Sequence, residues 1–252
     1  IISKRIRSIP EYGKLFIEAF DEISESNQIK INHIANALSD FINFEWRSYD
    51  SPFDSYIGGD VNALTMEQKR GLALFYGKAN CNQCHDGKFF TDHNFYALAL
   101  PHFGPGRTRI FDPYVRDVGR MGETDRLEDA YRFRTPSLRN VAITGPYGHN
   151  GSYATLVGII QHHLNPIYSF ENWNPSQVIL TKAKWLEDID FVALEDRLER
   201  DRLKSRIDIK PIDLSEEELS DLVSFMHALT GKESIWGKLG RPNKVPSGLP
   251  VD

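Results

Sequence analysis

At 252 residues, the chain is long enough to bury an apolar core without help from disulfides. Its hydrophobic share of 40% and charged share of 26% are those of an ordinary globular protein, and no apolar run approaches the roughly 18 to 20 residues of a membrane span. The net charge of −5 argues against a nucleic-acid partner, which would favour a basic face.

The first part of the chain is expected to be helical. Residues 1–44 show helical patterns interrupted at Pro10 and near residues 24–28. A turn-rich link, "SYDSPFDSYIGGD", follows over residues 48–60 and predicts a domain boundary near residue 56. The chain begins at Ile1 with neither an initiator Met nor a signal peptide, so we expect a processed or incomplete sequence.

A well-capped helix is expected next, over "LTMEQKRGLALFYGKAN". Thr65 is a suitable cap, and Gln68 stands three residues later in the capping-box position. This helix leads directly to Cys81. Residues 104–129 are rich in Gly, Arg and Asp with little periodicity, which indicates a long surface loop.

Three helical patterns follow this loop. After "HNGS", apolar residues recur at helical spacing and His163 falls on the same stripe, which holds Leu156, Ile159 and Ile160. Residues 184–207 alternate charged and apolar residues, as in a helix with one solvated face. The last pattern, "LSEEELSDLVSFMHALTG", has a capping box at Ser215 and Glu218 and an expected stop at Gly231. The fold is therefore predicted to be mostly α.

The stretch "CNQCH", residues 81–85, contains both cysteines of the chain and matches the C-x-x-C-H signature of covalent c-type haem attachment. Cysteines three apart on a helical turn can reach the two vinyl groups of one porphyrin, and the adjacent His85 brings an imidazole to the iron. A zinc site would need more ligands, a thioredoxin-type pair would need a βαβ setting, and a disulfide between Cys81 and Cys84 would close too short a loop to stabilise much. We therefore predict one covalent haem c.

The residues alone leave the sixth iron position open among several candidates. An open position binds peroxide or oxygen, whereas a filled one passes electrons. His163 is an imidazole on a buried helical stripe and needs a partner there. Met226 lies on an apolar stripe, where methionine usually packs, and Met121 lies in the expected loop.

Three stretches resemble the second half of bacterial di-haem cytochrome c peroxidases and the related MauG-type enzymes. They are "SPFDSYIGGDVNALTMEQKRGLALFYGKANCNQCH", "FRTPSLRNVAITGPYGHNGSYATL" and "LSEEELSDLVSFMHALTG". The resemblance covers about residues 8–163 and 214–231, and residues 166–212 look like an insertion.

The resemblance implies a domain plan. Residues 1–56 would be a helical segment from the end of the first, peroxidatic domain, and residues 57–231 a cytochrome c-like haem domain with long loops. Residues 232–252 would be a C-terminal tail. The first C-x-x-C-H of the family is absent from this sequence, so we expect no catalytic residue in this chain and one haem instead of two.

Site residues follow from the same resemblance. Cys81, Cys84 and His85 match the attachment and proximal-ligand positions of the electron-transfer haem. The family's distal ligand lies fourteen residues after the histidine matching His149, which gives His163, where the family has Met or Tyr. Bis-histidine ligation would give a lower potential than a His/Met pair.

The resemblance also suggests secondary contacts. Arg134 and Arg139 would lie near the haem, where a guanidinium suits a propionate, or would form surface ion pairs instead. Thr144 and Pro146 match positions whose backbone carbonyls bind calcium in the peroxidases.

The resulting expectation is the electron-transfer haem domain of a di-haem peroxidase-like oxidoreductase. It would relay electrons from a donor cytochrome or small redox protein to a peroxide-reducing haem upstream or on another chain. The alternative is a mono-haem relay subunit of a larger complex without peroxidase activity. Covalent haem attachment in the family takes place outside the cytosol, so we expect a periplasmic or otherwise exported protein.

Overall fold

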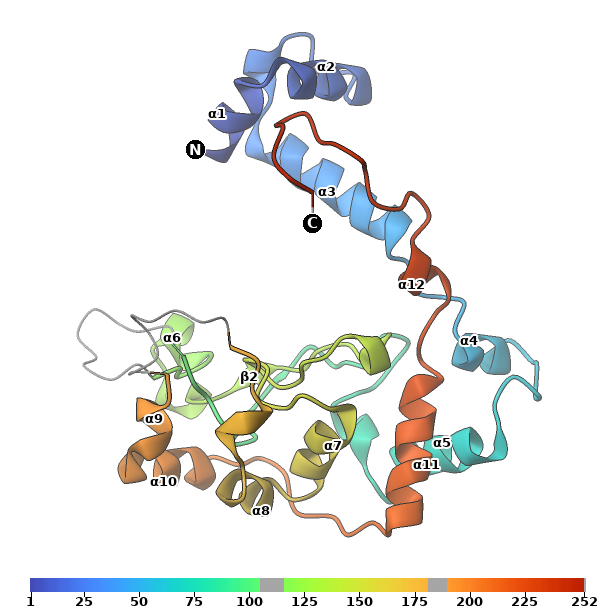
Figure 1. Ribbon diagram of the computed structural model, residues 1–252, viewed down its shortest axis with the longest axis vertical. Coiled ribbons are helices and arrows are strands. Elements are labelled where there is room, and N and C mark those ends of the chain that lie inside the picture. The colour runs from blue at the N-terminus through green and yellow to red at the C-terminus, as the bar shows by residue number, and fades with distance from the viewer. Residues whose placement is uncertain (105–115, 181–189, 252) are drawn as a thin grey trace. The chain divides into compact units, whose positions relative to one another are not determined.

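The computed structural model describes residues 1–104, 116–180 and 190–251 (Figure 1). These residues are mostly helical, as predicted, with one small sheet among them. They form two compact units, which divide at Asp50/Ser51 and at Thr230/Gly231. The C-terminal segment from Gly231 belongs to the same unit as the first 50 residues. The origin of the first unit in a peroxidatic domain stays a prediction.

The first unit is a small helical body. Its elements are α1 (Ile2–Arg7), α2 (Pro10–Ala19), η1 (Ser26–Gln28), α3 (Ile31–Glu45) and α12 (Glu233–Trp236). Phe16, Ile23 and Ile29 form its buried core. The buried Glu45 accepts hydrogen bonds from the backbone amides of Leu239 at 2.8 Å and Gly240 at 3.2 Å, which ties the C-terminal segment to the end of α3.

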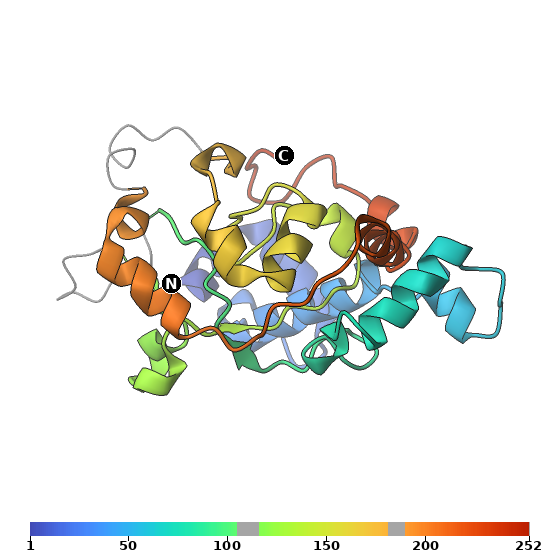
Figure 2. The same cartoon turned by 90° about the horizontal axis from the view of Figure 1, so that it is seen from below.

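The second unit contains the predicted haem motif. Its helices and strands are α4 (Pro52–Ile57), α5 (Met66–Tyr76), η2 (Cys81–Gln83), β1 (Phe95–Tyr96), α6 (Met121–Thr124), η3 (Leu127–Asp129), β2 (Phe133–Arg134), η4 (Val141–Ile143), α7 (Leu156–Leu164), α8 (Pro166–Glu171), η5 (Pro175–Gln177), α9 (Val192–Glu195), α10 (Arg197–Ser205) and α11 (Glu216–His227). Strand β1 pairs antiparallel with β2, with Phe95 opposite Arg134. Helices α7 and α8 lie next to each other (Figure 2).

Two helices far apart in sequence, α5 and α11, pack side by side (Figure 1). Both predicted capping boxes are confirmed, with Thr65 capping α5 and Ser215 capping α11. At the crossing, Arg70 donates two hydrogen bonds to Asp221, at 2.6 and 2.8 Å. Helix α11 ends at His227, so the expected stop at Gly231 is wrong. The main core lies against this helix pair and includes Phe53, Phe75, Phe90, Ile160, Leu222, Phe225, Met226 and Leu229.

The structure differs from the predictions for two segments, the loop expected over residues 104–129 and the charged helix expected over residues 184–207. The described end of the expected loop over residues 104–129 holds α6 and η3, while residues 105–115 lie outside the described residues. In the charged stretch 184–207, residues up to 189 are likewise not described, and two short helices follow, with Asp196 between them. The prediction that the charged residues of this stretch face solvent is wrong for Glu199, which is 0% exposed.

Glu199 is buried among one neighbour from its own helix and two partners distant in sequence. Its Oε2 lies 3.4 Å from Arg116 Nη1 and 3.3 Å from Arg202 Nη1, and its Oε1 lies 3.8 Å from Nε2 of the buried His102. A buried carboxylate is tolerated only when cations and donors compensate its lost hydration. Glu199 thus anchors α10 to the loop segments that hold His102 and Arg116.

Candidate functional site

The two cysteines and His85 lie in one tight turn. The backbone amides of Cys84 and His85 both donate to the carbonyl oxygen of Cys81, at 3.3 and 2.9 Å. Both cysteines are free and half-buried, and Cys81 packs against the main core. This turn therefore places two thiols and one imidazole in a single short segment beside an apolar core.

Both thiols are expected to be protonated at neutral pH when unmodified. Burial raises the pKa of Cys81 to about 12, and it also raises the pKa of Cys84. A protonated thiol is a poor nucleophile and a poor metal ligand. The environment therefore disfavours a free thiolate at rest, as suits cysteines that are consumed in a stable thioether linkage.

The ring of His85 is held in one tautomer. Its Nδ1 lies 3.0 Å from the carbonyl oxygen of Phe90. Because a carbonyl oxygen only accepts, Nδ1 carries the proton and the lone pair is left on Nε2. Burial, followed by the nearby His163, lowers the pKa of His85 to about 4, so the imidazole is neutral at physiological pH. A neutral imidazole with a free Nε2 is the form that binds a metal.

The ring of His163 is arranged in the same way. It lies in the last turn of α7, and its Nδ1 lies 2.8 Å from the carbonyl oxygen of Ile159, one turn earlier in the helix. Nδ1 is therefore the donor, and Nε2 keeps its lone pair. Burial lowers the pKa of His163, so this ring too is neutral.

The rings of His85 and His163 are neighbours although they are 78 positions apart in the sequence (163 minus 85). Their centroids are 6.5 Å apart and the ring planes are inclined by 55°. A metal bound by both imidazoles needs about 6 Å between the centroids, from two metal–nitrogen bonds of about 2 Å and about 1 Å from each nitrogen to its ring centre. The spacing and the donor set therefore fit an iron held between His85 and His163, with the two thiols beside it.

The predicted arginines make protein contacts. Nη1 of Arg139 donates to both carboxylate oxygens of Asp54 at 2.7 Å, and its Nε donates to the carbonyl oxygen of Lys88 at 2.9 Å. Arg134 is exposed and donates to Nδ1 of His93 at 2.8 Å. The structure thus gives Arg139 an ion pair between α4 and the segment after β2, and a contact of either arginine with a propionate stays a prediction.

This ion pair makes stability depend on pH. Burial by itself would raise the pKa of Asp54, but the hydrogen bonds from Arg139 and Ser51 outweigh it and hold the pKa below its ordinary value. A lowered carboxylate pKa contributes stability above the unfolded-state value of about 4, and that stability is lost as pH falls through the folded-state pKa. Urea unfolding should show wild type about 2 kcal/mol more stable than Asp54→Asn at neutral pH.

The difference between these two proteins should shrink below about pH 4 and vanish once Asp54 is protonated in the folded wild type. The exposed Asp60→Asn is the matched control. A wild-type advantage that stayed constant down to the lowest pH measured would show that the ion pair is not its source.

The remaining candidate ligands are placed as follows. Met226 is 4% exposed within the main core, and Met121 packs against a second core around Phe170 and Leu203. Thr144 follows η4, and the bond between Gly145 and Pro146 is cis. Among the described residues, no three His, Cys, Asp or Glu side chains gather as a metal site. Calcium at Thr144 and Pro146 stays a prediction.

Two neighbouring histidines are engaged with protein partners. Nε2 of His149 lies 2.8 Å from Asp117, and the ring stacks on Phe133. His162, beside His163, is fully buried and uses both ring nitrogens in hydrogen bonds. Helical periodicity placed His162 about 100° from the stripe of His163, but its partners are distant in sequence and the pattern gave no sign of them.

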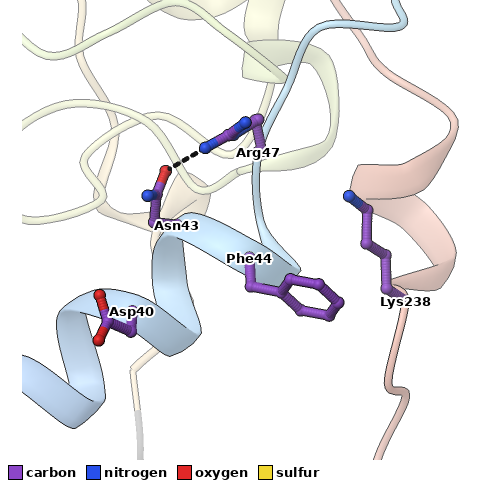
Figure 3. Close-up of a pocket in the computed structure, with 5 residues that line it drawn as sticks. All are labelled: Asp40, Asn43, Phe44, Arg47 and Lys238. Carbon is purple, nitrogen blue, oxygen red and sulfur yellow. Dashed lines mark hydrogen bonds between the residues drawn. The ribbon is translucent and has the colours of Figure 1, made fainter.

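The first unit has a pocket whose lining contains neither cysteine nor histidine (Figure 3). It is lined by Asp40, Asn43, Phe44, Arg47 and Lys238. Arg47 donates to Asn43 at 3.0 Å (Figure 3), and Nζ of Lys238 lies 5.2 Å from the centre of the Phe44 ring. Arg47 and Lys238 therefore have local partners.

Comparison with known proteins identifies the family of the chain. The family model described as di-haem cytochrome c peroxidase matches residues 1–62. Cytochrome-c peroxidase IdrP1 of Denitromonas iodatirespirans is 30% identical, over 93% of this chain and 58% of its own length. Methylamine utilization protein MauG of Methylorubrum extorquens is 29% identical, over 91% of this chain and 52% of its own length.

A solved structure is similar as well. A MauG-like protein associated with microbial copper homeostasis superposes with a TM-score of 0.61 at 28% identity, covering 92% of this chain and 61% of that one. The chain thus spans somewhat more than half the length of the relatives it matches. In the part of the chain that the structure describes, no helix is long and apolar enough to cross a membrane. From its sequence matches and its fold, this chain belongs to the family of MauG and the di-haem cytochrome c peroxidases.

Proposed function

We propose that this chain is the electron-transfer c-type haem domain of a di-haem cytochrome c peroxidase-like oxidoreductase. Family membership implies c-type haem as the cofactor. The observation that carries the finer assignment is the pair of neutral imidazoles, His85 and His163, with ring centroids 6.5 Å apart beside two free cysteines. When bound, the haem supplies a one-electron couple.

The proposal assigns a role to each of these residues. Cys81 and Cys84 would hold the haem covalently, and His85 and His163 would be the two protein ligands of its iron. With both ligand positions filled by protein, peroxide has no place to bind, so the site suits electron transfer. The apolar side chains of the main core keep water away from one side of the site, which limits solvent reorganisation on electron transfer.

The proposal includes partners outside this sequence. Electrons would come from a donor cytochrome or small redox protein and pass to a peroxide-reducing haem upstream or on another chain. Cytochrome c maturation takes place outside the cytosol, so the protein would be periplasmic or otherwise exported.

Haem counting and peroxide turnover test the proposal together. The chain, expressed with a cytochrome c maturation system, should hold one covalent haem by pyridine haemochrome assay and should accept electrons from a reduced donor cytochrome. By itself it should leave peroxide unreduced, and turnover should require a second, five-coordinate haem domain. Absence of covalent haem, or peroxide turnover by the one-haem chain, would overturn the proposal. Failure of any second haem domain to restore turnover would favour the mono-haem relay subunit.

A further inference from the structure

Helix α7 carries two adjacent histidines with different surroundings. His163 faces His85, whereas His162 is 0% exposed and is held at both ring nitrogens. Nε2 of His162 lies 2.7 Å from the carbonyl oxygen of Leu98 and Nδ1 lies 2.8 Å from the hydroxyl of Tyr153. Because the Leu98 carbonyl only accepts, Nε2 carries the proton, and Nδ1 accepts from Tyr153.

The hydrogen bonds extend beyond this pair. The hydroxyl of Tyr153, a residue that is 3% exposed, also lies 2.9 Å from Oγ of Ser169 on α8. Since the Tyr153 proton is directed to His162, Ser169 donates to the phenolic oxygen. The backbone of Tyr153 is fixed in turn by two hydrogen bonds with Tyr147, at 2.7 and 3.0 Å. One buried network therefore connects α7 to α8, to the segment after β1 and to the turn before α7.

We propose that Tyr153 and His162 are positioning residues that hold His163 in place as an iron ligand. This inference rests on the proposed function. Successive residues of a helix are about 100° apart around its axis, so the two histidines point in different directions and any rotation of α7 moves both. Fixing His162 at two points therefore fixes the direction in which His163 points.

Ligation of the iron depends strongly on the position of the His163 ring, because a bond from a ligand to a metal keeps within about 0.2 Å of its usual length. The hydrogen bond of His163 to Ile159 lies within α7 and moves with the helix, so it sets the tautomer but cannot stop a rotation. On this turn the Ile212 amide also donates to the carbonyl oxygen of Leu164, at 2.8 Å. Among the hydrogen bonds described for this turn, those of His162 are the ones that hold it to other segments through a side chain. A ring that leaves the iron position opens the site to exogenous ligands.

Conservative variants of the haem-loaded full chain test this inference. Tyr153→Phe removes the hydroxyl and keeps the ring, and His162→Phe removes both hydrogen bonds. Low-temperature electron paramagnetic resonance of each ferric, folded variant should show five-coordinate, high-spin iron in addition to the low-spin form. For Tyr153→Phe the ratio of high-spin to low-spin iron should rise about fivefold to tenfold, the factor that one net hydrogen bond supplies. His162→Phe should show a larger rise.

Tyr147→Phe is the matched control, because the Tyr147 hydroxyl donates to the carbonyl oxygen of Val141 at 2.8 Å and has no contact with His162 among the hydrogen bonds described. Its spectrum should match wild type even if its melting temperature falls. Should His162→Phe fail to fold, Tyr153→Phe alone decides.

Wild-type spin states in a folded Tyr153→Phe would overturn the positioning role and leave only a structural one. A wild-type protein that contains haem but lacks the low-spin signal of two imidazoles would instead overturn the proposed function. The two failures are therefore distinguishable from one set of spectra.

Discussion

Replacing His163 by alanine in the haem-loaded protein should convert the iron from six-coordinate and low-spin to five-coordinate and high-spin. The structure places this ring 6.5 Å from that of His85, centroid to centroid, with its Nε2 lone pair available. Removing it leaves the iron with His85 alone. The visible spectrum should shift accordingly, and added imidazole should restore the wild-type form.

The same position also controls the potential. His163→Met should keep six ligands and raise the reduction potential by on the order of 0.1 V, because a thioether stabilises the reduced iron more than an imidazole does. Redox titration measures this directly. His149→Ala is the control, since that ring is bound to Asp117 and is not expected to be a ligand. A His163→Ala spectrum identical to wild type would show that another residue, or none, holds the sixth position.

Gly71→Ala is expected to cost about 3 kcal/mol of the free energy of unfolding, the upper part of the usual range for overpacking. Gly71 lies where α5 crosses α11, and a Cβ added there would stand 2.0 Å from the carbonyl oxygen of Asp221 and 2.7 Å from Cβ of Phe225. Neither group can move aside easily, because one is backbone and the other is fully buried. The two helices would have to separate.

Gly71→Ala should also disturb the packing of the aromatic rings around Phe225. Phe225 contacts the rings of Phe53, Phe75 and Phe90, whose carbonyl oxygen fixes the tautomer of His85. Gly122→Ala is the control, because a Cβ there meets only a methyl group of Val118 at 3.8 Å. Denaturant unfolding of both variants measures the difference. Equal midpoints for the two would contradict the close packing of α5 on α11.

The features that the sequence predicts best are those formed by residues close together in the chain. The capping boxes of α5 and α11 are formed by residues three apart, so Thr65 with Gln68 and Ser215 with Glu218 are visible without a structure. The apolar stripe of α7 likewise predicted the buried positions of Ile159 and Ile160, whereas His163 on the same stripe is half-buried. The C-x-x-C-H motif is equally local, and attachment of haem through Cys81 and Cys84 stays a prediction.

Long-range contacts could not be predicted in this way. Glu199 lies in a charged stretch that favours a solvated helix, yet it is buried because Arg116 and His102 come to it from segments more than 80 positions away. Arg139 finds Asp54 across 85 positions. Single-sequence patterns contain no information on such pairs, and for the same reason they gave no role to His162, whose partner Leu98 is 64 positions away.

The ligation of the iron in the unmodified protein decides whether His85 and His163 act as its ligands. Low-temperature electron paramagnetic resonance of the ferric, haem-loaded chain, quantified against its haemochrome content, measures it. We expect a single low-spin species with two imidazole ligands, at one iron per chain. A chain without covalent haem, or a predominantly high-spin signal, would contradict an iron held between His85 and His163.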